Sequence, residues 1–354
     1  MKKFRFLTAG ESHGKCLTAI IEGIPAGFEI NIDFINNELK RRQSGYGRGD
    51  RMKIESDTIE ITSGIRFGKT LGSPITLVIQ NKDYENWQKI MSILPSDYTE
   101  EKSFTKCRPG HADFAGSIKY NQKDLRNILE RSSARKTAIE TAIGAIAKQI
   151  LAQFGITCYS KIVQIGNVTE NFNKEIDRIK EAGDTTGGKF EVVFENLPIG
   201  LGSYVHWDKM LDGKIAQAIM SIPAIKAVEI GQNPLGYLGS EYHDQMYIDN
   251  GKITRKTNNA GGIEGGMTNG ENLIVQAVMK PIPTLIKSLN TVDLNTMTEC
   301  EAHFERSDTC AVEACSVVAE ARIACIIADE ILDKFGGDSF NEIIKNFKNS
   351  AILI

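Results

Sequence analysis

Residues Arg131-Ser132-Ser133-Ala134-Arg135-Lys136-Thr137 run directly into a long apolar segment that ends at Leu151. Within it, isoleucine recurs at helical spacing and alanine forms a second stripe beside it. The two stripes consist of Ile139, Ile143, Ile146 and Ile150, and of Ala138, Ala142 and Ala145. Only Lys136, Glu140, Gly144 and Lys148 remain as a narrow polar edge. The stretch therefore predicts a mostly buried central helix.

The start of this helix is its most informative part. Ser132 and Ser133 are good N-cap residues, and the first N–H groups of a helix have no partner within it. With Arg131 and Arg135 beside them, these donors are suited to bind a phosphate or a carboxylate. The alternative is an ordinary serine cap with two solvated arginines, and the stretch alone does not decide between the two.

Composition restricts the class of protein. The 354 residues are 41% apolar and 25% charged with a net charge of -3, which is typical of a soluble globular protein and argues against general nucleic-acid binding. Seven cysteines without a CxxC pair favour neither a disulfide framework nor a zinc site, so reduced thiols and no metal are expected. Neither a signal peptide nor an apolar run that would span a bilayer is recognised, so we expect a cytoplasmic protein without membrane contact.

The string Gly10-Glu11-Ser12-His13-Gly14 follows a short predicted strand and matches the G-x-S-x-G nucleophile elbow of serine hydrolases. That elbow requires a helix directly after it, and residues 16–22 are too few and too β-branched to supply one. A hydrolase that uses Ser12 is therefore kept only as an alternative. The favoured interpretation is a tight turn that presents His13 to a pocket.

Two further loops carry candidate chemistry. Residues 40–51 hold five cations interleaved with glycine, among them Arg42 and Arg48, and we interpret them as an anion-binding loop; the alternative is a solvated run of charges. The string Arg108-Pro109-Gly110-His111-Ala112-Asp113 places a histidine in a loop, where it is either structural or catalytic. Residues 83–106 deliver the chain to that loop and are interpreted as a polar connection without chemistry of its own, or as a lid.

The second half of the chain echoes the first. Pro198-x-Gly200 repeats Pro25-x-Gly27, each leading from a predicted strand into a predicted helix. Arg306-Ser307-Asp308 precedes an alanine-rich helix as Arg131-Ser132-Ser133 precedes the central helix, and both helices end in Phe-Gly. We therefore expect one domain with two similar halves, about 1–170 and 171–354, related by a pseudo-two-fold axis.

A glycine-rich segment, residues 258–270, and the string Lys280-Pro281-Ile282-Pro283-Thr284 lie between these landmarks. The first matches neither a dinucleotide-binding fingerprint nor a P-loop, but its glycines let a backbone approach a flat or phosphorylated ligand closely. The second adds a cation and a hydroxyl. A glycine-rich hairpin and a proline-stiffened loop are the structural alternatives.

Taken together and in chain order, these strings resemble the chorismate synthase family over nearly the whole chain. The resemblance rests on the strings at 10–14, 108–113 and 131–135, on Gly261-Gly262-Ile263-Glu264-Gly265-Gly266 and on Arg306-Ser307-Asp308-x-Cys310-Ala311-Val312. Three positions depart from the family pattern: Lys136 replaces glutamate, Glu313 replaces a common proline, and Lys15-Cys16 replaces a more apolar pair. None is assigned to chemistry, although Lys136 removes a reciprocal capping box.

The resemblance implies an α+β fold with helices packed between antiparallel sheets, and a homotetramer. It also implies conversion of 5-enolpyruvylshikimate 3-phosphate to chorismate by a 1,4-anti-elimination of phosphate, with reduced FMN required but not consumed. The sequence leaves open whether NADPH reduces the flavin on this chain or a separate flavin reductase does so. The absence of an added reductase segment favours reduction from outside.

The same resemblance assigns roles to residues. His13 is expected to protonate the departing phosphate, His111 to stabilise the reduced flavin and Asp308 to help remove the C6 hydrogen, although which histidine takes which role stays open. Arg42 and Arg48 match positions that hold substrate or the nicotinamide nucleotide. The flavin-contacting positions are Arg131, Ser132, Ser133, Pro223, Ala224, Gly265, Lys280, Pro281, Ile282, Pro283, Thr284 and Arg306. All are expected to line one cationic cavity; a non-catalytic nucleotide-binding module is the second alternative.

Overall fold

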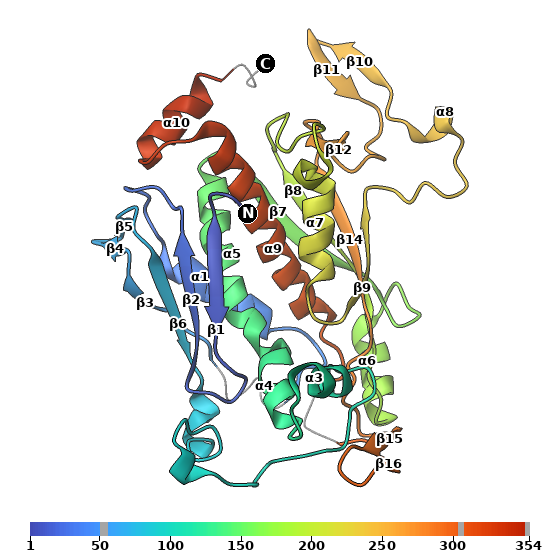
Figure 1. Cartoon of the computed structure of the whole chain (residues 1–354). Helices are drawn as coiled ribbons and strands as arrows, with labels where there is room; N and C mark the ends of the chain where they lie inside the picture. The colour runs from blue at the N-terminus through green and yellow to red at the C-terminus, as the bar shows by residue number, and fades with distance from the viewer. Residues whose placement is uncertain (50–55, 304–307, 351–354) are drawn as a thin grey trace.

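Two antiparallel sheets enclose a layer of helices in the computed structural model, which describes residues 1–49, 56–303 and 308–350 (Figure 1). The two longest helices of the described chain, α5 (Thr137–Ala152) and α9 (Val312–Phe335), lie side by side between the sheets. The fold is therefore α+β with helices between antiparallel sheets, as the sequence predicts.

Each sheet has four strands and turns one face toward the helices. The first sheet, in spatial order, consists of β1 (Arg5–Ala9), β2 (Cys16–Glu22), β6 (Ile75–Gln80) and β3 (Glu60–Ser63). The second consists of β7 (Thr157–Ile165), β8 (Gly188–Glu195), β14 (Leu273–Met279) and β9 (Ile225–Ile230). In the inner strands, buried apolar residues alternate with less buried ones, so every second side chain joins the core.

The two sheets have the same topology. Counted along the chain, each sheet places its first, second, fourth and third strand in that spatial order, and in each half a helix follows the second strand. These helices are α1 (Ile32–Gln43) and α7 (Leu211–Met220). The internal repeat is thereby confirmed. Because β7 already belongs to the second sheet, a boundary between the halves near residue 155 fits the strand order better than one near residue 170.

The central helix α5 is buried on every side. All four isoleucines of its apolar stripe are fully buried, as predicted. The narrow polar edge is also buried, because that side packs against α9: Gly144 lies so close to Ala321 that an added Cβ would be 2.2 Å from the Ala321 Cβ. Lys148 and Glu140 are buried as well and form ion pairs with residues of α1 and α9.

The start of the central helix also differs from the prediction. The chain forms α4 (Arg126–Ser132), a 3-10 turn η3 (Ala134–Lys136) and then α5, instead of one helix from residue 134. Ser132 is the last residue of α4, and its Oγ donates to the Ile128 carbonyl at 2.7 Å, so it is not an N-cap. Ser133 is extended and caps η3, its Oγ accepting from the Arg135 N–H at 3.3 Å.

The remaining elements are further helices, short turns and small hairpins. The other helices and turns are η1 (Lys82–Asn86), η2 (Pro95–Asp97), α3 (Asp113–Tyr120), α6 (Phe172–Glu181), η4 (Trp207–Lys209), α8 (Gly239–Tyr242) and α10 (Phe340–Lys348). The small hairpins are β4 (Ile65–Arg66) with β5 (Lys69–Thr70), β10 (Met246–Asp249) with β11 (Lys252–Arg255), β12 (Ile263–Glu264) with β13 (Met267–Thr268), and β15 (Asn290–Asp293) with β16 (Thr298–Glu301). Among the described residues, no helix has the length and apolar character needed to cross a bilayer.

Candidate active site

The first candidate turn, Gly10–Gly14, joins β1 to β2 in an antiparallel hairpin. Gly10 has a φ of 105°, and a Cβ there would lie 2.3 Å from the Cys16 carbonyl oxygen, so the turn requires glycine. A strand follows the turn, not the helix that a nucleophile elbow needs. The hydrolase alternative therefore fails on its structural context.

His13 is buried and held by one carboxylate. Its Nδ1 lies 2.9 Å from Glu130 Oε1, and its backbone N–H donates to Glu130 Oε2 at 2.8 Å. The Trp87 ring stacks on the imidazole with 4.0 Å between centroids. Ring orientation and main-chain position of His13 are thus fixed by Glu130 and Trp87, two residues that the sequence did not identify as functional.

Arg131 anchors the same turn from α4. Its Nη1 donates to the Gly10 carbonyl at 3.0 Å, and its Nη2 donates to the carbonyl and the Oγ1 of Thr8 at 2.9 and 2.8 Å. Because these bonds hold the end of β1, Arg131 positions the histidine turn in addition to any role toward a ligand.

Arg135 is buried rather than solvated, and it supports the turn through Asn81. The Asn81 amide group donates to the Gly14 carbonyl at 2.7 Å, while its Oδ1 accepts from Arg135 Nε and Nη2 at 3.0 and 2.9 Å. Arg135 Nη1 also pairs with Asp57 Oδ2 at 2.7 Å. The Gly10–Gly14 string and the Arg131–Arg135 string are therefore one hydrogen-bonded unit.

Arg42 lies against the start of α5. Its Nε donates to Thr137 Oγ1 at 3.0 Å and its Nη2 to the Ala134 carbonyl at 3.1 Å. Burial lowers the pKa of Arg42 to about 10, although the nearby Asp57 carboxylate acts in the opposite direction. Arg42 is thus a buried cation held at the start of α5, with the Asp57 carboxylate 4.0 Å away.

Arg48 and Asp308 lie together near Arg42. Arg48 Nε is 3.3 Å from Asp308 Oδ2, and the Gly49 N–H donates to Asp308 Oδ1 at 2.6 Å. The charges of both residues act on Arg42. Two candidates of the 40–51 loop are thereby brought together with Asp308 from a distant part of the sequence. The candidate Arg306 lies outside the described residues.

His111 belongs to a second histidine–carboxylate pair. Its Nδ1 is 2.6 Å from Asp113 Oδ1, and Arg108 donates from Nε to Asp113 Oδ2 at 2.8 Å. Asp113 is fully buried. Burial by itself would raise the pKa of the Asp113 carboxyl, but the hydrogen bonds from Arg108 and His111 hold that pKa well below its ordinary value.

The Lys280–Thr284 segment lies against the His111 loop. Lys280 Nζ donates to the Gly110 carbonyl, and the Lys280 N–H donates to the Ala224 carbonyl at 2.9 Å. Pro109, Gly110 and residues 280–283 line a cavity of about 290 Å³, together with residues of the 184–185 and 285–289 segments. The structure therefore unites the predicted residues Ala224 and Lys280–Pro283 with the loop that carries His111.

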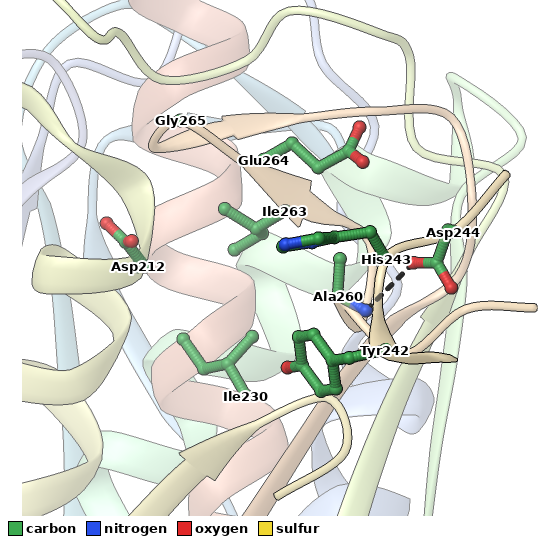
Figure 2. Close-up of a pocket in the computed structure, with 9 residues that line it drawn as sticks. All are labelled: Asp212, Ile230, Tyr242, His243, Asp244, Ala260, Ile263, Glu264 and Gly265. Carbon is green, nitrogen blue, oxygen red and sulfur yellow. Dashed lines mark hydrogen bonds between the residues drawn. The ribbon is translucent and has the colours of Figure 1, made fainter. Parts of the chain in front are cut away.

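Gly265 is not part of this group. It lies in the turn between β12 and β13, at the end of the molecule opposite α3 and α4 (Figure 1). There it lines a second cavity, of about 350 Å³, into which the His243 ring projects between Ile263 and Tyr242 (Figure 2). Three carboxylate residues, Asp212, Asp244 and Glu264, also line this cavity, so it lacks the cationic character expected for a phosphate site.

His13 and His111 lie at the two ends of a packed row of side chains. The guanidinium carbon of Arg126 is 5.2 Å from the Trp87 ring and 5.1 Å from the Phe104 ring, and that of Arg108 is 5.7 Å from Phe104. Neither histidine lines either of the two cavities above. Gly265 and the Lys280–Pro283 segment line two different cavities of the described chain, so a single cavity for all candidates stays a prediction.

Several residues that hold the candidates in place were missed. They are Asp57, Asn81, Trp87, Phe104, Arg126 and Glu130. Glu130 stands directly before Arg131 in the sequence, so its position in the string was a usable signal. Trp87 lies in the 83–106 connection, for which the sequence predicts either no chemistry of its own or a lid, and nothing local in the sequence indicates its contact with His13.

Comparison with known proteins agrees with the collinear strings. The family model described as chorismate synthase matches residues 4–332. The chain is 54% identical over 358 residues to a chorismate synthase of Thermoanaerobacter pseudethanolicus, with 99% of each chain covered, and 49% identical over 391 residues to one of Aquifex aeolicus, with 99% and 98% covered. A crystal structure of a chorismate synthase superposes with a TM-score of 0.78 at 40% identity, over 99% of this chain and 97% of that one.

Proposed function

The chain belongs to the chorismate synthase family, and on this premise we propose how its residues carry out the family's reaction. That reaction is the elimination of phosphate from 5-enolpyruvylshikimate 3-phosphate to give chorismate, by a lyase that depends on reduced flavin. The observation that carries the function is the similarity to a chorismate synthase over 99% of the chain at 54% identity. No single motif would be sufficient.

We propose FMN as the flavin. When bound, a reduced flavin supplies electron density to the breaking C–O bond and recovers it within the same turnover. The lining of the cavity beside the His111 loop supports such a group, because Pro109, Pro281 and Pro283 offer apolar walls. Lys280 and Lys287 offer two cations for an anionic tail against one carboxylate, that of Asp184. Arg131, Ser132, Ser133, Pro223, Ala224, Thr284 and Arg306 remain proposed contacts, whereas the position of Gly265 argues against its contact within the same protomer.

We propose that His13 is the proton donor to the departing phosphate and that His111 faces the bound flavin. Each histidine has Nδ1 against a buried carboxylate, at 2.9 Å for Glu130 and 2.6 Å for Asp113, which leaves Nε2 of His13 for a ligand. Nε2 of His111 lies 3.5 Å from Arg108 Nη2, a contact that a ligand would replace. The row of packed side chains between the two histidines must rearrange to admit a substrate. The irregular connection that carries Trp87 is therefore suited to act as a lid.

The anionic groups of the substrate need cations. We propose that Arg42 and Arg48 bind the substrate carboxylates and phosphate or the nicotinamide nucleotide, and that Asp308 takes part in removing the hydrogen from C6. The buried Arg42 and the 3.3 Å contact between Arg48 and Asp308 support a shared site for these three residues.

We further propose a homotetramer that acts in the cytoplasm and receives reducing equivalents from NADPH or from a separate flavin reductase. Large exposed apolar side chains support self-association, since Trp207, Leu235 and Ile248 are 78%, 84% and 74% exposed. Sedimentation at several protein concentrations tests the assembly. Anaerobic mixing of the protein, oxidised FMN and NADPH tests whether this chain reduces its own flavin.

One assay separates the candidate functions. Purified protein is incubated anaerobically with chemically reduced FMN and 5-enolpyruvylshikimate 3-phosphate, and phosphate release is followed together with the ultraviolet absorbance of the new diene. We expect phosphate and the diene to form in equal amounts, and to form only when the flavin is reduced. A nucleotide-binding module would form neither product, and a serine hydrolase would be labelled at Ser12 by a fluorophosphonate without flavin.

A further inference from the structure

We propose that Glu130 is the positioning residue of the proton donor: it fixes the tautomer and orientation of His13 and balances the ring's positive charge before proton transfer. The inference rests on the proposed role of His13. Glu130 is 4% exposed and lies on α4, whose next residue, Arg131, holds the other side of the same turn. The carboxylate is therefore part of a rigid support and not a surface charge.

The two oxygens of Glu130 act on different parts of His13. Oε2 accepts the backbone N–H of His13 at 2.8 Å and fixes the main chain, whereas Oε1 lies 2.9 Å from Nδ1 of the ring. Because a carboxylate only accepts hydrogen bonds, Nδ1 must carry a hydrogen in both protonation states of the ring. Nε2 is then the single ring atom that exchanges a proton with a ligand.

This arrangement defines the proton transfer. In the charged ring both nitrogens carry hydrogen, and the Glu130 carboxylate balances the charge. As phosphate leaves, the Nε2–H bond breaks, its electron pair stays on Nε2, and a new O–H bond forms on the phosphate. The neutral ring retains its Nδ1 hydrogen toward Glu130, and water returns a proton to Nε2. No rotation of the ring is needed between turnovers.

The other groups that face His13 hold the His13–Glu130 pair in place. Arg126 Nη1 lies 3.5 Å from Glu130 Oε1 and thereby holds the carboxylate, and the Arg126 guanidinium also covers the Trp87 ring. Trp87 in turn stacks on the imidazole at 4.0 Å. The Ser12 N–H donates to the Glu130 carbonyl at 2.8 Å. These contacts hold the His13 ring, the Glu130 carboxylate and the adjacent main chain in fixed positions.

The test uses the full-length protein in the anaerobic assay with saturating reduced FMN, and it measures kcat and KM separately. Glu130→Gln keeps the shape and removes the charge, and Glu130→Asp keeps the charge. The matched control is Glu140→Gln, because Glu140 is also a buried helical carboxylate and pairs with Arg322 at 2.8 Å. Glu130→Gln is expected to lower kcat about 100-fold with KM within about threefold, as for loss of general acid catalysis. Glu130→Asp should recover part of kcat, and Glu140→Gln should retain wild-type kcat.

The outcomes separate this inference from the function on which it rests. A kcat for Glu130→Gln within threefold of wild type, a change confined to KM, or an equal loss in Glu140→Gln overturns it. If Glu130→Gln does not fold, Glu130→Asp decides: a lower kcat at unchanged KM supports the inference, and a change in KM alone overturns it. A wild-type protein that forms no product overturns the function itself, whereas an active His13→Ala variant overturns both the role of His13 and this inference but leaves the function standing.

Discussion

Thr70 and Thr268 make the same hydrogen bonds in the two halves of the chain. Thr70 Oγ1 donates to the Pro25 carbonyl at 2.6 Å and accepts the Phe28 N–H at 2.9 Å. Thr268 Oγ1 donates to the Pro198 carbonyl at 2.6 Å and accepts from the N–H of the third residue after that proline, again at 2.9 Å. Both threonines end a small hairpin, β5 or β13, and both are buried, so the repeat extends to individual hydrogen bonds.

This correspondence predicts that Thr70→Val and Thr268→Val have similar effects. Each change leaves a proline carbonyl and a buried N–H without their partner, which costs about 1–3 kcal/mol of the free energy of unfolding. Urea unfolding of the two variants measures this cost. Thr254→Val on the less buried strand β11 is the control and is expected to change stability by less than about 0.5 kcal/mol. A large loss in only one half would contradict the equivalence.

The close approach of α5 and α9 at Gly144 gives a second prediction. An added Cβ would lie 2.2 Å from the Cβ and 2.4 Å from the Cα of Ala321, so Gly144→Ala forces the two helices apart. We expect a loss of about 1–3 kcal/mol, the usual cost of overpacking a core. Gly213→Ala in α7 is the matched control, because the nearest atom to its added Cβ is 3.9 Å away. That variant should be unchanged or more stable by up to about 1 kcal/mol, and equal losses in the two variants would exclude the packing argument.

Part of this fold was predictable from the sequence. The stripes of α5 and the echo of Pro25-x-Gly27 in Pro198-x-Gly200 were sufficient for a buried helix, two similar halves and the α+β class. The break at Ser133 was not predictable, because a serine either caps a following helix or, like Ser132, bonds back to a carbonyl four residues earlier. The local string is the same in both cases.

The candidate site was predictable only where its residues support one another within or between the quoted strings. Arg131 of one string donates to Gly10 at the start of the His13 turn in another, and His111 and Asp113 pair two residues apart in one string. The contact of Trp87 with His13 and the remote position of Gly265 depend on tertiary arrangement. A motif assigns residues to a site but does not give their distances.

Asp113 predicts a pH dependence of stability. Its folded pKa lies below the ordinary value of 3.8, so the carboxylate stabilises the fold fully above roughly pH 4, and this contribution is lost as the pH falls further. Asp113→Asn is expected to cost about 3 kcal/mol at neutral pH, because Arg108 then keeps a buried charge with a weaker partner. Urea unfolding from neutral to acid pH should show the difference from wild type shrinking below roughly pH 4. A constant difference across that range would rule out the linkage.

The buried thiols predict selective chemical labelling. Burial raises the pKa of Cys315 and of Cys325 to about 12, so the reactive thiolate is suppressed at neutral pH. The protonated thiols favour the fold fully below the ordinary pKa of 9.0, and this contribution is lost as the pH rises toward 12. With a disulfide reagent and peptide mass analysis, we expect the less buried Cys16 and Cys300 to be labelled first. Urea-unfolded protein supplies the control, in which all sites react; rapid labelling of Cys315 in the folded protein would contradict the assignment.

Lys148 predicts the largest loss of stability. It lies between α1 and α9, pairs with Glu38 at 2.5 Å and with Glu320, and is 7% exposed. Burial lowers the pKa of Lys148, but the charges of Cys158, Glu320 and Glu38 together outweigh it and hold that pKa above its ordinary value, so the residue stays charged. Lys148→Met leaves two buried carboxylates with Arg41 as their remaining cation partner among the contacts described, and we expect a cost of about 3–5 kcal/mol.

A double-mutant cycle distinguishes this pairing from lost packing. Glu320→Gln removes one of the two carboxylate charges, so Lys148→Met combined with Glu320→Gln should cost less than the sum of the single changes by about 1–3 kcal/mol. The matched cycle uses the exposed pair Lys2 and Asp333, whose atoms are 2.6 Å apart but whose side chains are 54% and 35% exposed. Solvent screening limits the coupling in that pair to about 0–1 kcal/mol. Equal coupling energies in the two cycles would show that burial between the halves does not strengthen the interaction of Lys148 with Glu320.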